Sequence, residues 1–228
     1  MKNLVCNSIL TIACAVFAVA AQADGHAGNA SNGETIAKAE CAACHGADGN
    51  SSSPMFPKLA GLGEKYLLKQ LHDIKNAAEG GDPKAAKRAI TEMAGLLDKK
   101  SEQDLADLAA YYASKTTQLS GAKEMKVQVN SGAQVDAIKL GAQVYRAGNL
   151  ETGVPACTGC HSPRGLGNAP AGYPRLSGQH ADYIEKQLKD FRAGNRTNDG
   201  DTMVMREVAN HMSDAEIKAV ANFISGLN

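Results

Sequence analysis

The sequence has 228 residues, a length that allows one large domain or two small ones. Its 24 basic and 24 acidic residues balance, which gives no support to a nucleic-acid-binding or membrane-surface protein. Aromatic residues make up only 4% of the chain and Trp is absent, although 43% of the residues are hydrophobic. Small domains fill a core poorly with such small side chains, so a bulky buried cofactor would account for the deficit.

The N-terminal segment has the features of an export signal. Lys2 precedes an apolar stretch from about Ile9 to Ala21, and Ala21-Gln22-Ala23 supplies the small residues of a cleavage site. The apolar stretch is shorter than the roughly 20 residues that span a bilayer, which argues against a membrane anchor. We therefore expect residues 1–23 to be a cleavable signal peptide and the mature protein to lie in the periplasm.

The remainder of the chain is an internal repeat, because residues 33–118 and 141–228 show the same features in the same order. The repeat predicts two similar domains joined by a polar segment without periodicity. The matched features are Cys41-x-x-Cys44-His45 with Cys157-x-x-Cys160-His161, FPKLAG from Phe56 with YPRLSG from Tyr173, and Tyr66-x-x-x-Gln70-Leu71 with Tyr183-x-x-x-Gln187-Leu188. The expected boundaries are residues 24–118 for the N-terminal domain, 119–134 for the linker and 135–228 for the C-terminal domain.

Each half is expected to end in an amphipathic helix. Ser213-Asp214-Ala215-Glu216 forms a capping box and Ser101-x-x-Asp104 a weaker one, and apolar residues follow both at helical spacing. The segments at Tyr66 and Tyr183 also predict helices, whereas the Gly-, Pro- and Ser-rich stretches after each C-x-x-C-H motif predict loops. No strand is expected, so the predicted fold is all-α.

The C-x-x-C-H motif is the attachment signature of c-type haem. Two cysteines three positions apart in a helical turn can each bond one vinyl group of the same porphyrin. The histidine that follows then faces the iron. Two copies predict two covalently bound haem c groups, attached through Cys41, Cys44, Cys157 and Cys160.

The two motif histidines, His45 and His161, are the expected proximal ligands of the haem iron. Each would use one ring nitrogen for the metal and leave the other to donate to an acceptor nearby. The backbone carbonyls of Pro57 and Pro174 are the candidate acceptors.

Two other interpretations of the motif fit less well. A zinc site would need further Cys or His ligands at a regular spacing, and neither half offers a second pair. A redox-active dithiol of the thioredoxin type would need a βαβ pattern, which the sequence lacks. Haem attachment is therefore the favoured interpretation.

A methionine thioether as the sixth ligand would close the iron and raise its reduction potential, whereas an empty position would let small gases or peroxide bind. Met93 and Met205 coincide when the terminal helices of the two halves are aligned. Met203 competes with Met205, because a two-residue slip in a loop would exchange them. The methionines and histidines without a repeated counterpart are expected to be packing, surface or boundary residues: Met55, Met125, Met212, His72, His180 and His211.

The sequence resembles the di-haem cytochrome c4 family. The resemblance rests on CAACHGADGNS and FPKLAG in the first half, and on ETGVPACTGCHSPRGLGNAPAGYPRLSGQH and NRTNDGDTMVM in the second. It covers essentially the whole mature chain. It implies two tandem class I cytochrome c domains, related by a pseudo-twofold axis, with His45, Met93, His161 and Met205 as axial haem ligands.

The resemblance also implies a function. The family consists of periplasmic electron carriers whose redox partners are quinol-oxidising complexes, including quinol–cytochrome c oxidoreductase, and terminal cytochrome oxidases, with a loose membrane association in some members. A haem electron-transfer subunit of a periplasmic dehydrogenase is the alternative, which co-purification would separate from a free carrier. A di-haem peroxidase would need one open iron, and the matching methionines of the two halves argue against it.

Overall fold

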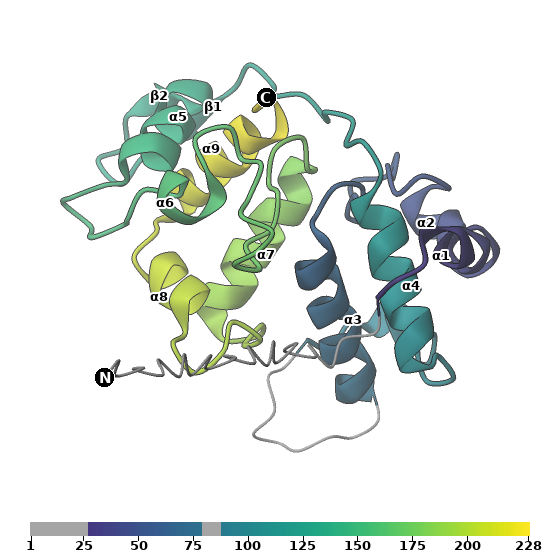
Figure 1. The fold of residues 1–228 in the computed structure, drawn as a ribbon. Helices are drawn as coiled ribbons and strands as arrows, with labels where there is room; N and C mark the ends of the chain where they lie inside the picture. The colour runs from purple at the N-terminus through teal and green to yellow at the C-terminus, as the bar shows by residue number, and fades with distance from the viewer. Residues whose placement is uncertain (1–26, 79–87) are drawn as a thin grey trace, which may run out of the picture.

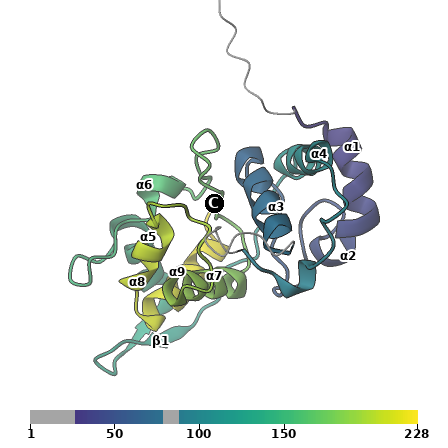
Figure 2. The same ribbon diagram turned by 90° about the horizontal axis from the view of Figure 1, so that it is seen from below.

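The computed structural model describes residues 27–78 and 88–228. The expected signal peptide, residues 1–23, lies outside these described residues. The described part forms two helical lobes that lie side by side and are joined by an extended segment (Figure 1). A view turned by 90° separates the same two lobes (Figure 2). No helix of the described part is long and apolar enough to cross a membrane.

The four helices predicted at Tyr66, at Tyr183 and at the end of each half are present, together with helices that the sequence did not predict, and the described part is all-helical apart from one short hairpin. The first lobe contains α1 (Ala30–Ile36), the π-helical segment η1 (Ala37–Cys41), α2 (Ala42–His45), α3 (Glu64–Ala78), the 3₁₀ turn η2 (Thr91–Met93) and α4 (Glu102–Ala113). The second lobe contains β1 (Lys126–Gln128), β2 (Gln134–Asp136), α5 (Ala137–Ala147), α6 (Thr158–His161), α7 (Ala181–Ala193), α8 (Val204–Asn210) and α9 (Asp214–Ser225).

The hairpin of β1 and β2 corrects the expectation that the chain has no strand. The two strands pair antiparallel, with Val127 opposite Val135. β1 lies inside the segment 119–134 that was expected to be a linker, and β2 begins at its last residue, Gln134. Val127 is buried against Ala137 and Ala215 of the second lobe. Each strand has only three residues, too few for an alternating pattern to stand out in the sequence.

The capping boxes at the start of α4 and α9 are both formed. The Ser101 hydroxyl accepts from the Asp104 amide at 3.1 Å, and the Asp104 carboxylate accepts from the Ser101 amide at 2.8 Å. Ser213 and Glu216 make the same exchange at 3.3 and 2.8 Å. The helices expected after these serines are thereby confirmed, and their first turns are satisfied by local side chains.

Each lobe is closed by its first and last helices, which cross at a glycine. A Cβ atom on Gly33 of α1 would lie 2.0 Å from the Asp107 carbonyl oxygen of α4. In the second lobe, a Cβ on Gly141 of α5 would lie 2.2 Å from the Ala219 carbonyl oxygen of α9. These distances leave no room for a side chain, so the close approach of the two backbones depends on glycine.

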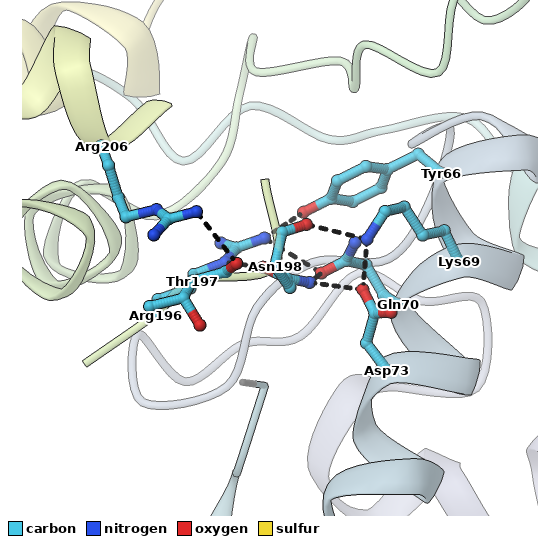
Figure 3. A network of polar contacts seen from close by, with 8 residues as sticks. All are labelled: Tyr66, Lys69, Gln70, Asp73, Arg196, Thr197, Asn198 and Arg206. Carbon is cyan, nitrogen blue, oxygen red and sulfur yellow. Dashed lines mark hydrogen bonds and ion pairs between the residues drawn. The ribbon is translucent and has the colours of Figure 1, made fainter. Parts of the chain in front are cut away.

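The lobes meet where α3 faces α7, through hydrogen bonds of buried polar side chains (Figure 3). Arg196 of the second lobe donates to the Gln70 side-chain oxygen at 3.0 Å and to the Tyr66 hydroxyl at 3.2 Å, both on α3. Arg196 also donates to the side-chain oxygen of Gln187, in its own lobe, at 2.8 Å. The contact is reciprocal, because Arg88 of the first lobe donates to Gln187 at 2.7 Å and to the Tyr183 hydroxyl at 2.9 Å.

Asn198 extends this interface along α3 (Figure 3). Its amide nitrogen donates to Gln70 at 2.9 Å and to the Asp73 carboxylate at 2.7 Å. Lys69 donates to the Asn198 carbonyl at 2.8 Å and pairs with Asp73 at 2.5 Å. The hydrogen bonds of the buried Gln70, Arg196 and Asn198 side chains fix one relative position of the lobes, since sliding would leave these groups unsatisfied.

A second set of interlobe contacts lies beside the loops that contain Pro57 and Pro174. Gln179 accepts from the Lys58 amide at 2.9 Å and donates to the Lys58 carbonyl at 2.8 Å. The His180 ring lies between the lobes, with Nε2 at 2.9 Å from the Ser51 carbonyl and Nδ1 at 3.0 Å from the Ser120 hydroxyl. His180 is thus a boundary histidine, as expected, and it ties the extended segment to both lobes.

The glycine crossing generates a stability prediction. We expect Gly141→Ala to lower the melting temperature of the haem-loaded protein, because overpacking of this kind costs about 1–3 kcal/mol. Gly159→Ala is the matched control, since no atom lies within 4 Å of the added Cβ and the first lobe carries Ala43 at the corresponding position. Equal melting temperatures for the two variants would contradict the proposed role of the crossing.

Candidate haem-binding sites

Both C-x-x-C-H motifs end a short helix. His45 is the last residue of α2 and His161 the last residue of α6. In the first lobe, Cys41 ends the π-helical segment, whose wide turn is closed by the Ala42 amide donating to the Ala37 carbonyl. Such single π-helical turns are frequent at functional sites. All four motif cysteines carry free thiols, so each is available for a thioether bond.

The two motif histidines have equivalent hydrogen bonds. His45 Nδ1 lies 2.9 Å from the Pro57 carbonyl oxygen, and His161 Nδ1 lies 3.0 Å from the Pro174 carbonyl oxygen. A carbonyl can only accept, so Nδ1 carries the proton in both rings and Nε2 keeps its lone pair. The expected contacts with Pro57 and Pro174 are therefore present, and each ring is oriented with a nitrogen free to bind a metal.

The surroundings of the two imidazoles are also equivalent. Only 8% of His45 and 7% of His161 is exposed. Burial is the main cause that lowers the pKa of both rings, so both are neutral at neutral pH. An aromatic ring stands 6.2 Å from each imidazole, Phe56 in the first lobe and Tyr173 in the second. The sites are thus apolar and exclude water from the ring.

The cysteines do not have the properties of a redox-active dithiol. Burial raises the pKa of the Cys157 thiol to about 11, and burial also raises the pKa of Cys41. Reactive dithiols have thiols of lowered pKa, so the buried cysteines resemble attachment residues more than catalytic ones. Residues 27–78 and 88–228 contain no group of three or more His, Cys, Asp or Glu side chains arranged to hold a bare metal ion.

The structure separates the two competing methionines of the second lobe. Met205 is the second residue of α8 and packs against the hydrophobic core of this lobe. Met203 precedes the helix, is 40% exposed and has a left-handed backbone with φ of 49°. Both methionines were expected to lie in a loop, but α8 begins at Val204. Side chains two positions apart at a helix start point in different directions, so only one of the two methionines can face the core. This geometry favours Met205.

Met93 occupies the matching place in the first lobe, in the turn η2. The described buried hydrophobic residues of this lobe form two clusters, which Leu68 and Leu71 connect. Cys41 packs against the cluster around Leu108, and Met93 packs against the cluster around Leu105. A haem attached at Cys41 and bound by Met93 would contact both clusters. The residues present therefore fit a haem group, which would complete a core that is poor in large side chains.

Two buried tyrosines secure the loops that follow the motif histidines, and sequence reasoning did not find them. Tyr111 of α4 donates to the Ala47 carbonyl at 2.6 Å, whereas Tyr145 of α5 donates to the Ser162 carbonyl at 2.7 Å. Tyr111 lies on the last helix of its lobe and Tyr145 on the first helix of its lobe, so the repeat alignment does not pair them. Equivalent contacts made from non-equivalent positions leave no signal in an internal repeat.

Comparison with known proteins agrees with this geometry. The Cytochrome c family matches residues 30–115 and 138–228. Cytochrome c4 of Azotobacter vinelandii is 52% identical over 202 residues, which are 89% of this chain and 90% of that protein. The crystal structure of reduced recombinant cytochrome c4 from Pseudomonas stutzeri superposes with a TM-score of 0.80 at 49% identity, over 89% of this chain and 100% of that one. The chain belongs to the di-haem cytochrome c4 family. It therefore binds two haem c groups and is an electron-transfer cytochrome, not an enzyme.

A more distant relative is named for a different role. The thiosulfate dehydrogenase electron acceptor of Thiomonas intermedia is 35% identical over 189 residues, which are 82% of this chain and 78% of that protein. The chain is thus also similar to a protein named as an electron acceptor of a dehydrogenase.

The tyrosine contacts generate a second stability prediction. We expect Tyr145→Phe to lower the free energy of unfolding by about 1 kcal/mol, because the variant loses the hydrogen bond to the Ser162 carbonyl. The measurement is the denaturant midpoint of the haem-loaded protein. Tyr173→Phe is the control, since Tyr173 is 37% exposed and the loss of its hydroxyl should leave the midpoint unchanged. A midpoint for Tyr145→Phe that equals the control would argue against the anchor.

Proposed function

We propose that the chain is a periplasmic electron carrier of a respiratory chain, which accepts electrons from quinol-oxidising complexes and delivers them to terminal oxidases. The observation that supports this best is the repetition of one arrangement in both lobes. Each lobe has a buried neutral histidine held by a proline carbonyl and a partly buried methionine further along the chain. A catalyst would instead need one site that differs from the other by an open position.

The proposed site residues follow the motif and the packing. In this proposal residues 24–118 form the N-terminal domain, 119–134 the segment between the domains and 135–228 the C-terminal domain, with β1 and β2 packed on the latter. The cysteines would form the thioether bonds, and the histidines and methionines would bind the iron. The residues for covalent attachment are Cys41, Cys44, Cys157 and Cys160, and those proposed as axial ligands are His45, Met93, His161 and Met205.

Each protein group has a distinct part in the proposed transfer. When bound, the haem supplies an iron that gains and loses one electron. The Nδ1 hydrogen bonds of His45 and His161 hold the rings in one orientation. The methionines would keep water and small ligands away from the metal. A site closed on both sides rearranges little when its charge changes, which suits rapid transfer between proteins.

A role as the electron acceptor of a periplasmic dehydrogenase is the second candidate. It is supported by the 35% identity to the thiosulfate dehydrogenase electron acceptor of Thiomonas intermedia, over most of both chains. Purification from native extracts separates the candidates: an acceptor subunit elutes with a larger dehydrogenase polypeptide, whereas a respiratory carrier elutes alone and is oxidised by membranes that contain a terminal oxidase.

The assignment of the second methionine generates a spectroscopic prediction. We expect Met205→Ala to open one of two irons, so that carbon monoxide changes the spectrum of about half of the reduced haem. Met203→Ala is the matched control, because this exposed side chain lies two residues away and should leave the spectrum insensitive to carbon monoxide. A response in Met203→Ala alone would reverse the assignment of the ligand.

A further inference from the structure

One buried hydroxyl group of the first lobe has no hydrogen-bond partner. Within the described residues, three buried side-chain polar atoms lack a partner: Arg88 Nε, Ser177 Oγ and the Tyr112 hydroxyl. Of these residues, Tyr112 is the one that packs in a hydrophobic cluster with a cysteine of a C-x-x-C-H motif, Cys41. Its side chain belongs to α4, and the residue is only 3% exposed. A buried donor without a partner destabilises the fold, so an acceptor is needed.

The position of Tyr112 is fixed by its neighbours. A Cβ atom on Gly49 would lie 2.7 Å from the tyrosine ring, so the ring rests on the backbone of the loop that follows His45. Burial and the adjacent Cys41 side chain raise the pKa of the Tyr112 phenol, which therefore keeps its proton and remains a donor. The hydroxyl is thus held next to the cysteine sulfur with its proton available.

The second lobe has no such group at the corresponding place. Alignment of α4 with α9 puts Ile224, which is 2% exposed, at the position of Tyr112. Gly165 follows His161 as Gly49 follows His45, and a Cβ on Gly165 would lie 2.9 Å from Leu227. Tyr145, whose phenol interacts with Cys157, already donates to the Ser162 carbonyl. The surroundings of the two first cysteines therefore differ by one free donor.

We propose that Tyr112 tunes the first haem: its hydroxyl donates a hydrogen bond to the thioether sulfur at Cys41 and makes this haem easier to reduce than it would be without the donor. The inference rests on the proposed attachment of haem at Cys41. A thioether sulfur is a weak acceptor, but a bond in an apolar interior is strengthened by the low dielectric constant. Hydrogen bonds around a haem are one of the protein's means of setting its potential. The donor withdraws electron density from the sulfur, which favours the reduced state.

This asymmetry gives the two lobes different tasks. Ile224 stands at the position of Tyr112 in the second lobe, so only the first lobe has a hydroxyl here that can stabilise the reduced haem. Removal of the donor should then alter one haem and leave the other as it is. The direction of the change distinguishes this tuning from a general loss of stability.

The test is the Tyr112→Phe variant, exported with its haem groups, with the potential of each haem measured separately. We expect the reduction equilibrium constant of the first-lobe haem to fall about threefold, a shift of roughly 30 mV at 59 mV per tenfold change. The second-lobe haem should keep its potential. Proton magnetic resonance of the oxidised protein provides the assignment, because the Cys41 methylene signals should move and the Cys157 signals should not.

Tyr111→Phe is the matched control on the same helix. Its hydroxyl donates to the Ala47 carbonyl at 2.6 Å, so its loss should lower stability and leave both potentials unchanged. Unchanged potentials in Tyr112→Phe, or equal shifts of both haems, would overturn the tuning role. A wild-type protein that carries fewer than two haem groups would instead overturn the proposed function, so the two failures are distinguishable.

Discussion

The hydrogen bond between each motif histidine and a proline carbonyl is the contact on which both lobes depend. At 2.9 Å for His45 and 3.0 Å for His161, it fixes the ring, the tautomer and the free nitrogen together. It also constrains the path of the chain, because the loop after each motif must bring its proline carbonyl back to the histidine. The crossing of the first and last helices then closes the lobe around this loop.

The two lobes share this plan and differ in the groups that surround it. The loop anchor is a tyrosine of the last helix in the first lobe and a tyrosine of the first helix in the second. Between the lobes, Arg88 and Arg196 reach across in opposite directions to the tyrosine and glutamine of α3 and α7. A rigid, polar interface of this kind holds two similar sites at one separation while each keeps its own environment. Two carriers in one chain can therefore be non-equivalent without any change of fold.

Much of this architecture could be predicted from the sequence, because the repeat supplies an internal comparison. The motif histidines, their proline acceptors and the serine caps recur, and the structure places each contact as expected. The hairpin at Val127 could not be found, since three-residue strands carry no period. The roles of Arg196 and Asn198 were also missed, although the repeated Tyr-x-x-x-Gln spacing, which puts two polar side chains on one helix face, could have suggested a polar interface. Long-range partners depend on how the lobes meet, which no local pattern records.

The most direct test of two closed haem sites in one electron carrier is the visible spectrum of the reduced, exported protein before and after addition of carbon monoxide. The account predicts two c-type haems for each chain and a spectrum that carbon monoxide leaves unchanged, because both irons are bound on both sides. A change in half of the haem would show that one site is open, and would contradict the account by placing this chain closer to a catalyst than to a carrier.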